Sequence, residues 1–149
     1  LNLSQEALEE LCVKQLKNGQ AIWFACDAGA FGARKEGIWD PASVQYEALL
    51  GGFSTAMPKG KRLEYNSSSA THAMLLTGVH FDKEGKPDRW KIENSWGKDV
   101  GDKGYFVCSE AYFQEFVYEA VIDRRHFSPA QLAMLEKAPV VINAWDEDY

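Results

Sequence analysis

Two strand-like runs joined by a short turn constrain the fold of this chain more than any other feature. Residues 71–81 and 90–93 are rich in apolar, β-branched and aromatic side chains, and the segment between them carries Gly85 and Pro87, which favour turns. These runs predict a β-hairpin. Further short strands are predicted at residues 21–26, 104–108 and 117–122. Strands of this kind, linked mostly by short connections, predict an antiparallel sheet.

Helical patterns are confined to a few segments. Apolar residues recur at helical spacing between residues 4 and 18, where Ser4 is a typical N-cap and Gly19 a typical stop. Short capped helices are predicted at 40–50, at 109–116 and from residue 128. The glycine-rich segment 27–39 predicts an irregular loop, and the polar segment 58–69 predicts a surface loop. The fold class is therefore predicted to be α+β, an antiparallel sheet with a few peripheral helices.

The size and charge of the chain limit its organisation and its partners. With 149 residues, 46% of them hydrophobic, the chain can form one core. We predict one folded unit over residues 1–138 and an extended C-terminal arm over 139–149. A net charge of −6 disfavours broad contact with nucleic-acid phosphates. No apolar run approaches the length of a transmembrane helix, so neither nucleic acid nor a membrane is a predicted partner.

The three cysteines predict packing thiols and not a disulfide framework. Cys12, Cys26 and Cys108 are odd in number, widely spaced and set in apolar patterns. Reduced thiols are typical of the cytoplasm, which is the predicted location. No Cys-x-x-Cys and no Cys/His cluster at metal spacing occurs. We therefore predict no metal and no other cofactor.

Other polar residues are predicted to lie on the surface. His80 falls on a predicted strand, and His126 follows two arginines at a strand end, so both are predicted to be surface histidines. The spacing of the acidic residues matches no calcium loop, so they predict a solvated face. They are Asp99, Asp102, Asp146, Glu147 and Asp148.

Two short motifs carry the chemistry of the chain. The first is Ser-Ala-Thr-His-Ala-Met, which contains His72, and the second is Glu-Asn-Ser-Trp-Gly, which contains Asn94 and Trp96. Followed by Gly-Tyr-Phe, they resemble the His and Asn motifs of papain-like cysteine peptidases. The segments 71–121 and 138–145 resemble bleomycin hydrolase and bacterial aminopeptidase C in particular. The resemblance implies the C-terminal portion of such a peptidase, with residues 1–138 as its His/Asn-bearing lobe.

Thiol catalysis explains why these residue types occur together. An imidazole takes the thiol proton and later protonates the leaving amine, a role predicted for His72. An amide oxygen that binds the other ring nitrogen orients the imidazole without adding a charge, a role predicted for Asn94. By resemblance, Trp96 shields their hydrogen bond from water. The alternative is a satisfied histidine at a strand start and an asparagine in a turn.

The nucleophile is where the chain departs from the family pattern. In papain-like enzymes the cysteine lies roughly 130 residues or more before the histidine, whereas Cys26 lies only 46 positions before His72 and is followed by Asp27. We predict that the nucleophile lies in an absent N-terminal half and that this chain alone is inactive. The first residue, Leu1, also suggests a piece of a longer protein. Two alternatives are a non-catalytic binding or structural domain and a self-sufficient hydrolase that uses one of the three thiols.

The resemblance also implies partners. It implies peptide substrates and a homo-oligomer, a hexamer in this family. It further implies that the C-terminal arm enters the active site, where the carboxylate of Tyr149 would bind the substrate's free α-amine. The alternative for Tyr149 is a frayed acidic terminus.

Overall fold

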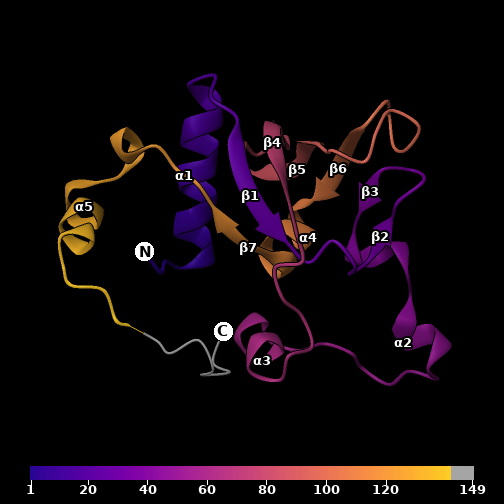
Figure 1. Cartoon of the computed structure of the whole chain (residues 1–149). Coiled ribbons are helices and arrows are strands. Elements are labelled where there is room, and N and C mark those ends of the chain that lie inside the picture. The colour runs from indigo at the N-terminus through magenta and orange to yellow at the C-terminus, as the bar shows by residue number, and fades with distance from the viewer. Residues whose placement is uncertain (142–149) are drawn as a thin grey trace.

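The computed structural model describes residues 1–141, and within them a single sheet forms the centre of the fold (Figure 1). Its seven strands lie in the order β2-β3-β6-β5-β4-β1-β7. Neighbouring strands pair antiparallel except β3 and β6, which are parallel. The predicted α+β class with an antiparallel sheet is confirmed. The strands are β1 (Ile22–Cys26), β2 (Gly32–Ala33), β3 (Ile38–Trp39), β4 (His72–Phe81), β5 (Pro87–Glu93), β6 (Tyr105–Ser109) and β7 (Val117–Ala120).

Serine caps set the starts of the longer helices. The side chains of Ser4, Ser109 and Ser128 each accept a hydrogen bond from the backbone N–H three residues further on, which satisfies one of the free donors at a helix start. These starts agree with the sequence prediction. The helices are α1 (Gln5–Lys17), α2 (Tyr46–Leu49), α3 (Lys59–Glu64), α4 (Glu110–Phe116) and α5 (Pro129–Leu135), with 3-10 turns η1 (Pro41–Ser43) and η2 (Arg124–His126). None of these helices is long and apolar enough to cross a membrane.

Helices α1 and α4 pack on one face of the sheet and enclose the core with it. Alternate residues of the strands point to this face, so Trp90 of β5 stacks on Phe113 of α4 with ring centroids 4.2 Å apart. The opposite face leaves apolar side chains partly exposed in the described chain. They include Trp23, Leu75, Tyr105 and Val107.

Segment 27–39 is ordered, contrary to the prediction of an irregular loop. Strands β2 and β3 pair as a small hairpin, and β3 joins the sheet beside β6. Gly37, at φ +74°, lies so close to the chain at Gly101 that an added Cβ would come within 2.6 Å of the Gly101 Cα. The two glycines therefore let the hairpin dock against the 97–104 loop.

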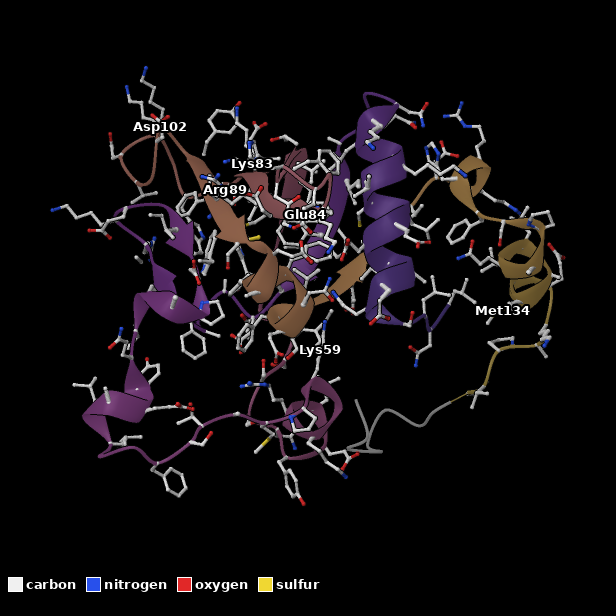
Figure 2. The ribbon with its side chains drawn as sticks, turned by 180° about the vertical axis from the view of Figure 1, so that it is seen from behind. Lys59, Lys83, Glu84, Arg89, Asp102 and Met134 are labelled. Atoms are coloured by element: carbon white, nitrogen blue, oxygen red, sulfur yellow. The ribbon has the colours of Figure 1, made fainter. Side chains whose placement is uncertain are left out.

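The surface loop predicted at 58–69 is also wrong, because residues 59–64 form helix α3. Lys59 extends from α3 toward the end of α4 (Figure 2). Its Nζ donates hydrogen bonds to Gln5 Oε1 at 2.7 Å and to the Gln114 carbonyl at 3.1 Å. Tertiary contacts of this kind stabilise helices too short to form from local sequence alone. The single helix predicted at 40–50 is likewise divided into η1 and α2.

Of the two histidines predicted to lie at the surface, one is exposed and the other is buried. His80 is exposed, as predicted, and pairs with Asp88. His126 is only 7% exposed, so its predicted surface position is wrong. Turn η2, capped by Asp123, directs His126 inward, where its Nε2 lies 2.8 Å from Gln20 Oε1. The acidic residues Asp99 and Asp102 are exposed, as predicted. Figure 2 labels Asp102.

Candidate active site

The pairing of β4 with β5 brings His72 and Asn94 together. His72 is the first residue of β4, and Asn94 directly follows the last residue of β5. Because Leu75 lies opposite Glu93 in this antiparallel pair, both residues lie at the same end of the sheet. His72 Nε2 lies 3.0 Å from Asn94 Oδ1. The backbone N–H of Asn94 donates to the Gly104 carbonyl at 3.1 Å, which fixes the asparagine against the loop before β6.

The partners of Asn94 define the protonation of His72. Asn94 Oδ1 also accepts a hydrogen bond from the Ser95 backbone N–H at 2.7 Å, and a backbone N–H can only donate, which identifies this side-chain atom as the oxygen. Nε2 of His72 must therefore carry a proton. In the neutral ring Nδ1 then keeps a free lone pair, and within residues 1–141 it has no hydrogen-bond partner. The imidazole is thus arranged to accept a proton at Nδ1.

Trp96 covers one face of the imidazole. The two ring centroids are 4.9 Å apart, and the ring planes differ by 22°. Trp96 in turn packs against Trp39 of β3 and Phe106 of β6, at centroid distances of 5.8 and 5.7 Å. The indole is therefore fixed by its contacts in the core and lies over the imidazole that contacts Asn94.

A chain of hydroxyl and carboxylate groups supports the segment that leads into β4. Tyr118 of β7 donates to Ser68 Oγ at 2.7 Å, and Ser68 donates to Asp27 Oδ2 at 2.7 Å. The Thr71 backbone N–H donates to the Cys26 carbonyl at 3.0 Å. Sequence reasoning missed this network, because Ser68 reads as one of three loop serines and its partners lie more than 40 positions away.

The three thiols of the chain are buried, as predicted for packing residues. Burial raises the pKa of Cys12 to about 12 and that of Cys26 to about 11, and it raises the pKa of Cys108 well above its ordinary value. These thiols therefore remain protonated near neutral pH, whereas a nucleophile must be a thiolate.

Arg34 is a further polar group near the pair, and the sequence analysis did not identify it. Its Cζ lies 4.4 Å from the centroid of the Trp96 ring. Arg34 belongs to the β2–β3 hairpin. The sequence signal that could have predicted this hairpin is Gly37 followed by the isoleucine and tryptophan of β3. The predicted role of Tyr149 concerns a residue outside the described range 1–141.

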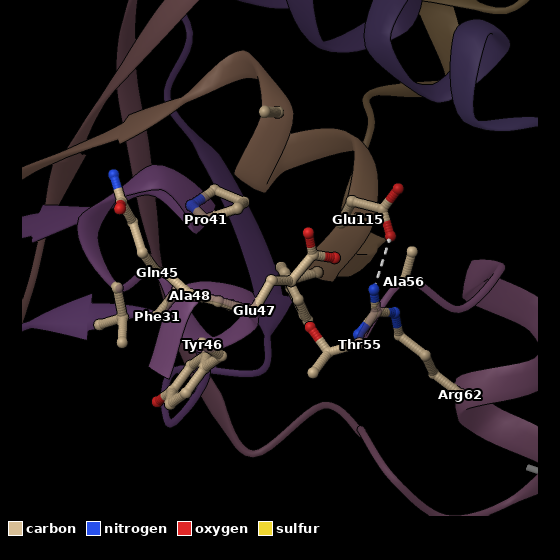
Figure 3. A pocket seen from close by; sticks show the side chains of 13 residues that line it. Phe31, Pro41, Gln45, Tyr46, Glu47, Ala48, Thr55, Ala56, Arg62 and Glu115 are labelled. Carbon is tan, nitrogen blue, oxygen red and sulfur yellow. Dashed lines mark ion pairs between the residues drawn. The ribbon is translucent and has the colours of Figure 1, made fainter. Parts of the chain in front are cut away.

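A cavity of about 550 Å³ lies apart from this pair, between α2, α3 and α4 (Figure 3). Within it, Arg62 Nη2 and Glu115 Oε2 are 3.4 Å apart, and the Arg62 guanidinium also lies over the Phe116 ring. Neither His72 nor Asn94 lines the cavity. The candidate active site is thus the end of the sheet that carries His72 and Asn94, both half-buried, and not this pocket.

Comparisons with known proteins relate the whole chain to one family. The model of the peptidase C1-like family matches residues 1–147. Aminopeptidase C of Streptococcus thermophilus is 40% identical over 98% of this chain and 33% of its own length, and human bleomycin hydrolase is 39% identical over 93% and 31%. The crystal structure of PepW from Lactobacillus rhamnosis superposes with a TM-score of 0.85 at 44% identity, covering 91% of this chain and 30% of PepW. The chain spans about a third of these relatives and corresponds to their C-terminal portion.

Proposed function

The chain belongs to the peptidase C1-like family, and on that premise we propose that it is the His/Asn-bearing lobe of a thiol aminopeptidase. The enzyme would hydrolyse peptide and amide bonds through an acyl-enzyme. The observation that carries this proposal is the 3.0 Å contact between His72 Nε2 and Asn94 Oδ1 beneath the Trp96 indole.

In the proposed reaction His72 moves one proton in each half. Its Nδ1 takes the proton of a cysteine thiol, and the thiolate attacks the carbonyl carbon of the substrate. The tetrahedral intermediate breaks the C–N bond as the imidazolium returns the proton to the leaving amine, which leaves a thioester. Nδ1 then takes a proton from water, whose oxygen attacks the thioester. The acid is released, and the proton returns to the cysteine sulfur.

Asn94 keeps the imidazole aligned throughout this cycle. Nε2 carries a proton in both the neutral ring and the imidazolium, so its hydrogen bond to Asn94 Oδ1 persists while Nδ1 gains and loses its proton. Because the amide is neutral, Asn94 orients the ring without adding a charge beside it.

We propose that the nucleophile lies outside these residues, in the remaining part of a longer polypeptide. The burial of all three thiols supports this assignment, because a self-sufficient hydrolase would need one of them as a thiolate near His72. Residues 1–149 alone are expected to have no peptidase activity.

The wider properties of the enzyme are also proposals. We propose peptide substrates, a cytoplasmic location, and a substrate α-amine held by the Tyr149 carboxylate. We further propose a homo-oligomer, with the exposed apolar side chains of the open sheet face as the supporting observation.

Hydrolysis of an aminoacyl anilide by the full-length polypeptide tests the proposed function. Leucine anilide should be cleaved, its N-acetylated form should be cleaved much more slowly, and His72→Ala should remove the activity. An inactive full-length protein, or one whose activity survives His72→Ala, would refute the assignment and favour a non-catalytic domain of papain-like shape.

A further inference from the structure

Arg34 places a positive charge close to the proposed catalytic histidine. The Arg34 Cζ lies 4.4 Å from the Trp96 ring centroid, and that centroid lies 4.9 Å from the centroid of His72. The guanidinium carbon is therefore at most about 9 Å from the centre of the imidazole. Arg34 is exposed, and among residues 1–141 it forms neither an ion pair nor a side-chain hydrogen bond.

The backbone beside Arg34 is fixed against the loop that follows Asn94. The Lys35 carbonyl accepts a hydrogen bond from the Gly101 N–H at 3.2 Å, and the Gly37 carbonyl accepts one from the Val107 N–H at 2.8 Å. The Gly37 and Gly101 backbones are in close contact. The hairpin thus positions Arg34 over Trp96.

Trp96, over which Arg34 lies, covers the imidazole that handles the leaving group in the proposed reaction. In the proposed reaction His72 protonates the leaving amine, so the departing part of the substrate begins beside the imidazole. The departing part of the substrate would therefore contact the side chains that flank the imidazole ring. An extended residue spans about 3.3–3.6 Å, so two residues beyond the cleaved bond reach about 7 Å from His72. A charge-assisted hydrogen bond of about 2.8 Å covers the remaining distance to the Arg34 guanidinium.

We propose that Arg34 is a specificity-determining residue, which binds a carboxylate carried by the first or second residue of the leaving group. This inference rests on the proposed peptidase function. The carboxylate is the C-terminus of a di- or tripeptide or an acidic side chain. The Arg34 guanidinium carbon lies over the Trp96 ring, 4.4 Å from its centroid, and no side chain among residues 1–141 binds its N–H groups. Arg34 can therefore hold a carboxylate bidentately while it stays over the indole.

The test compares two substrates that differ only in this charge. The kcat/KM values of Leu-Ala-Ala and Leu-Ala-Ala-amide are measured with the full-length enzyme and with its Arg34→Gln, Arg34→Lys and Lys35→Gln variants. The ratio of kcat/KM for the acid to kcat/KM for the amide should fall about three- to tenfold in Arg34→Gln, as for a partly exposed charge pair. It should fall less in Arg34→Lys, which keeps the charge without the fork, and should not change in Lys35→Gln. Effects of lost packing on Trp96 alter both substrates and cancel in the ratio.

Each other outcome has a separate meaning. A ratio unchanged in Arg34→Gln overturns the inference while the proposed function stands. An equal fall in Lys35→Gln also overturns it, because the effect would then be a general field of the hairpin. Absence of turnover of both substrates by the wild-type enzyme refutes the proposed function itself, and with it this inference.

Discussion

Cys26 lies directly opposite His72 in the antiparallel pairing of β1 with β4, yet its thiol is not poised to react with that imidazole. Cys26 is fully buried, and burial raises its pKa to about 11. Cross-strand neighbours lie about 5 Å apart at their Cβ atoms, so proximity alone does not make a catalytic pair. Reactivity depends on whether the thiol is ionised, and the raised pKa of Cys26 keeps it in the neutral, unreactive form.

The roles assigned to His72 and Asn94 predict unequal losses of activity in the full-length enzyme. His72→Ala removes the proton carrier and should lower kcat by about 10⁴-fold. Asn94→Ala removes only the orientation of the ring and should lower kcat by about 10²-fold. His80→Ala, at an exposed histidine, is the control and should retain activity. Equal losses in the first two variants would contradict these roles.

The hydrogen bonds that join Tyr118, Ser68 and Asp27 predict that substitutions in this network lower the stability of the fold. A substitution at an exposed tyrosine should not. Ser68→Ala leaves Asp27 Oδ2 without its hydroxyl donor and should lower the free energy of unfolding by about 1–3 kcal/mol. Tyr118→Phe removes one hydroxyl and should cost about 1 kcal/mol. Urea unfolding of the chain measures both, with Tyr65→Phe, at a 70% exposed tyrosine, as the control. An unfolding free energy of Ser68→Ala equal to that of Tyr65→Phe would show that the network does not stabilise the fold.

Glu110 predicts a pH dependence of stability. Burial raises its pKa from 4.5 to about 7, and the nearby Glu9 carboxylate adds to the rise. The folded state therefore binds the proton more tightly than the unfolded state. The stabilisation is complete below pH 4.5 and is lost as the pH rises to about 7. Because Glu110 is half-buried, solvent screening limits the effect to about 1 kcal/mol.

Glu110→Gln should remove this component, so the unfolding free energy of the variant should fall less between pH 4.5 and 7 than that of the wild type. Glu84→Gln, at an exposed carboxylate, should follow the wild type. Superimposable pH curves for the wild type and Glu110→Gln would show that the carboxyl is not perturbed.

Local sequence was sufficient for the elements that depend on period and capping. Strand-type residues along 71–81 and 90–93, with turn residues between them, predicted the central hairpin. Ser4, Ser109 and Ser128 marked helix starts, because capping signals act within a few residues. The pairing of His72 with Asn94 followed from the motifs together with the hairpin that joins them.

Features that depend on distant contacts escaped prediction. Helix α3 is anchored by the hydrogen bond from Lys59 to the Gln114 carbonyl of α4. Ser68 is buried and forms hydrogen bonds with Asp27 and Tyr118. Neither contact has a local signature. Arg34 likewise gains its place only because the β2–β3 hairpin docks on the loop after Asn94.

Mapping the reactive thiol tests the central claim, that His72 and Asn94 activate a cysteine outside residues 1–149. The full-length protein is treated briefly at neutral pH with an irreversible thiol-directed electrophile, and the modified cysteine is located by peptide mass spectrometry, in the wild type and in His72→Ala. We predict rapid labelling of one cysteine outside these residues, slowed by His72→Ala, while Cys12, Cys26 and Cys108 stay unmodified. Rapid labelling of Cys26 that depends on His72 would contradict the account.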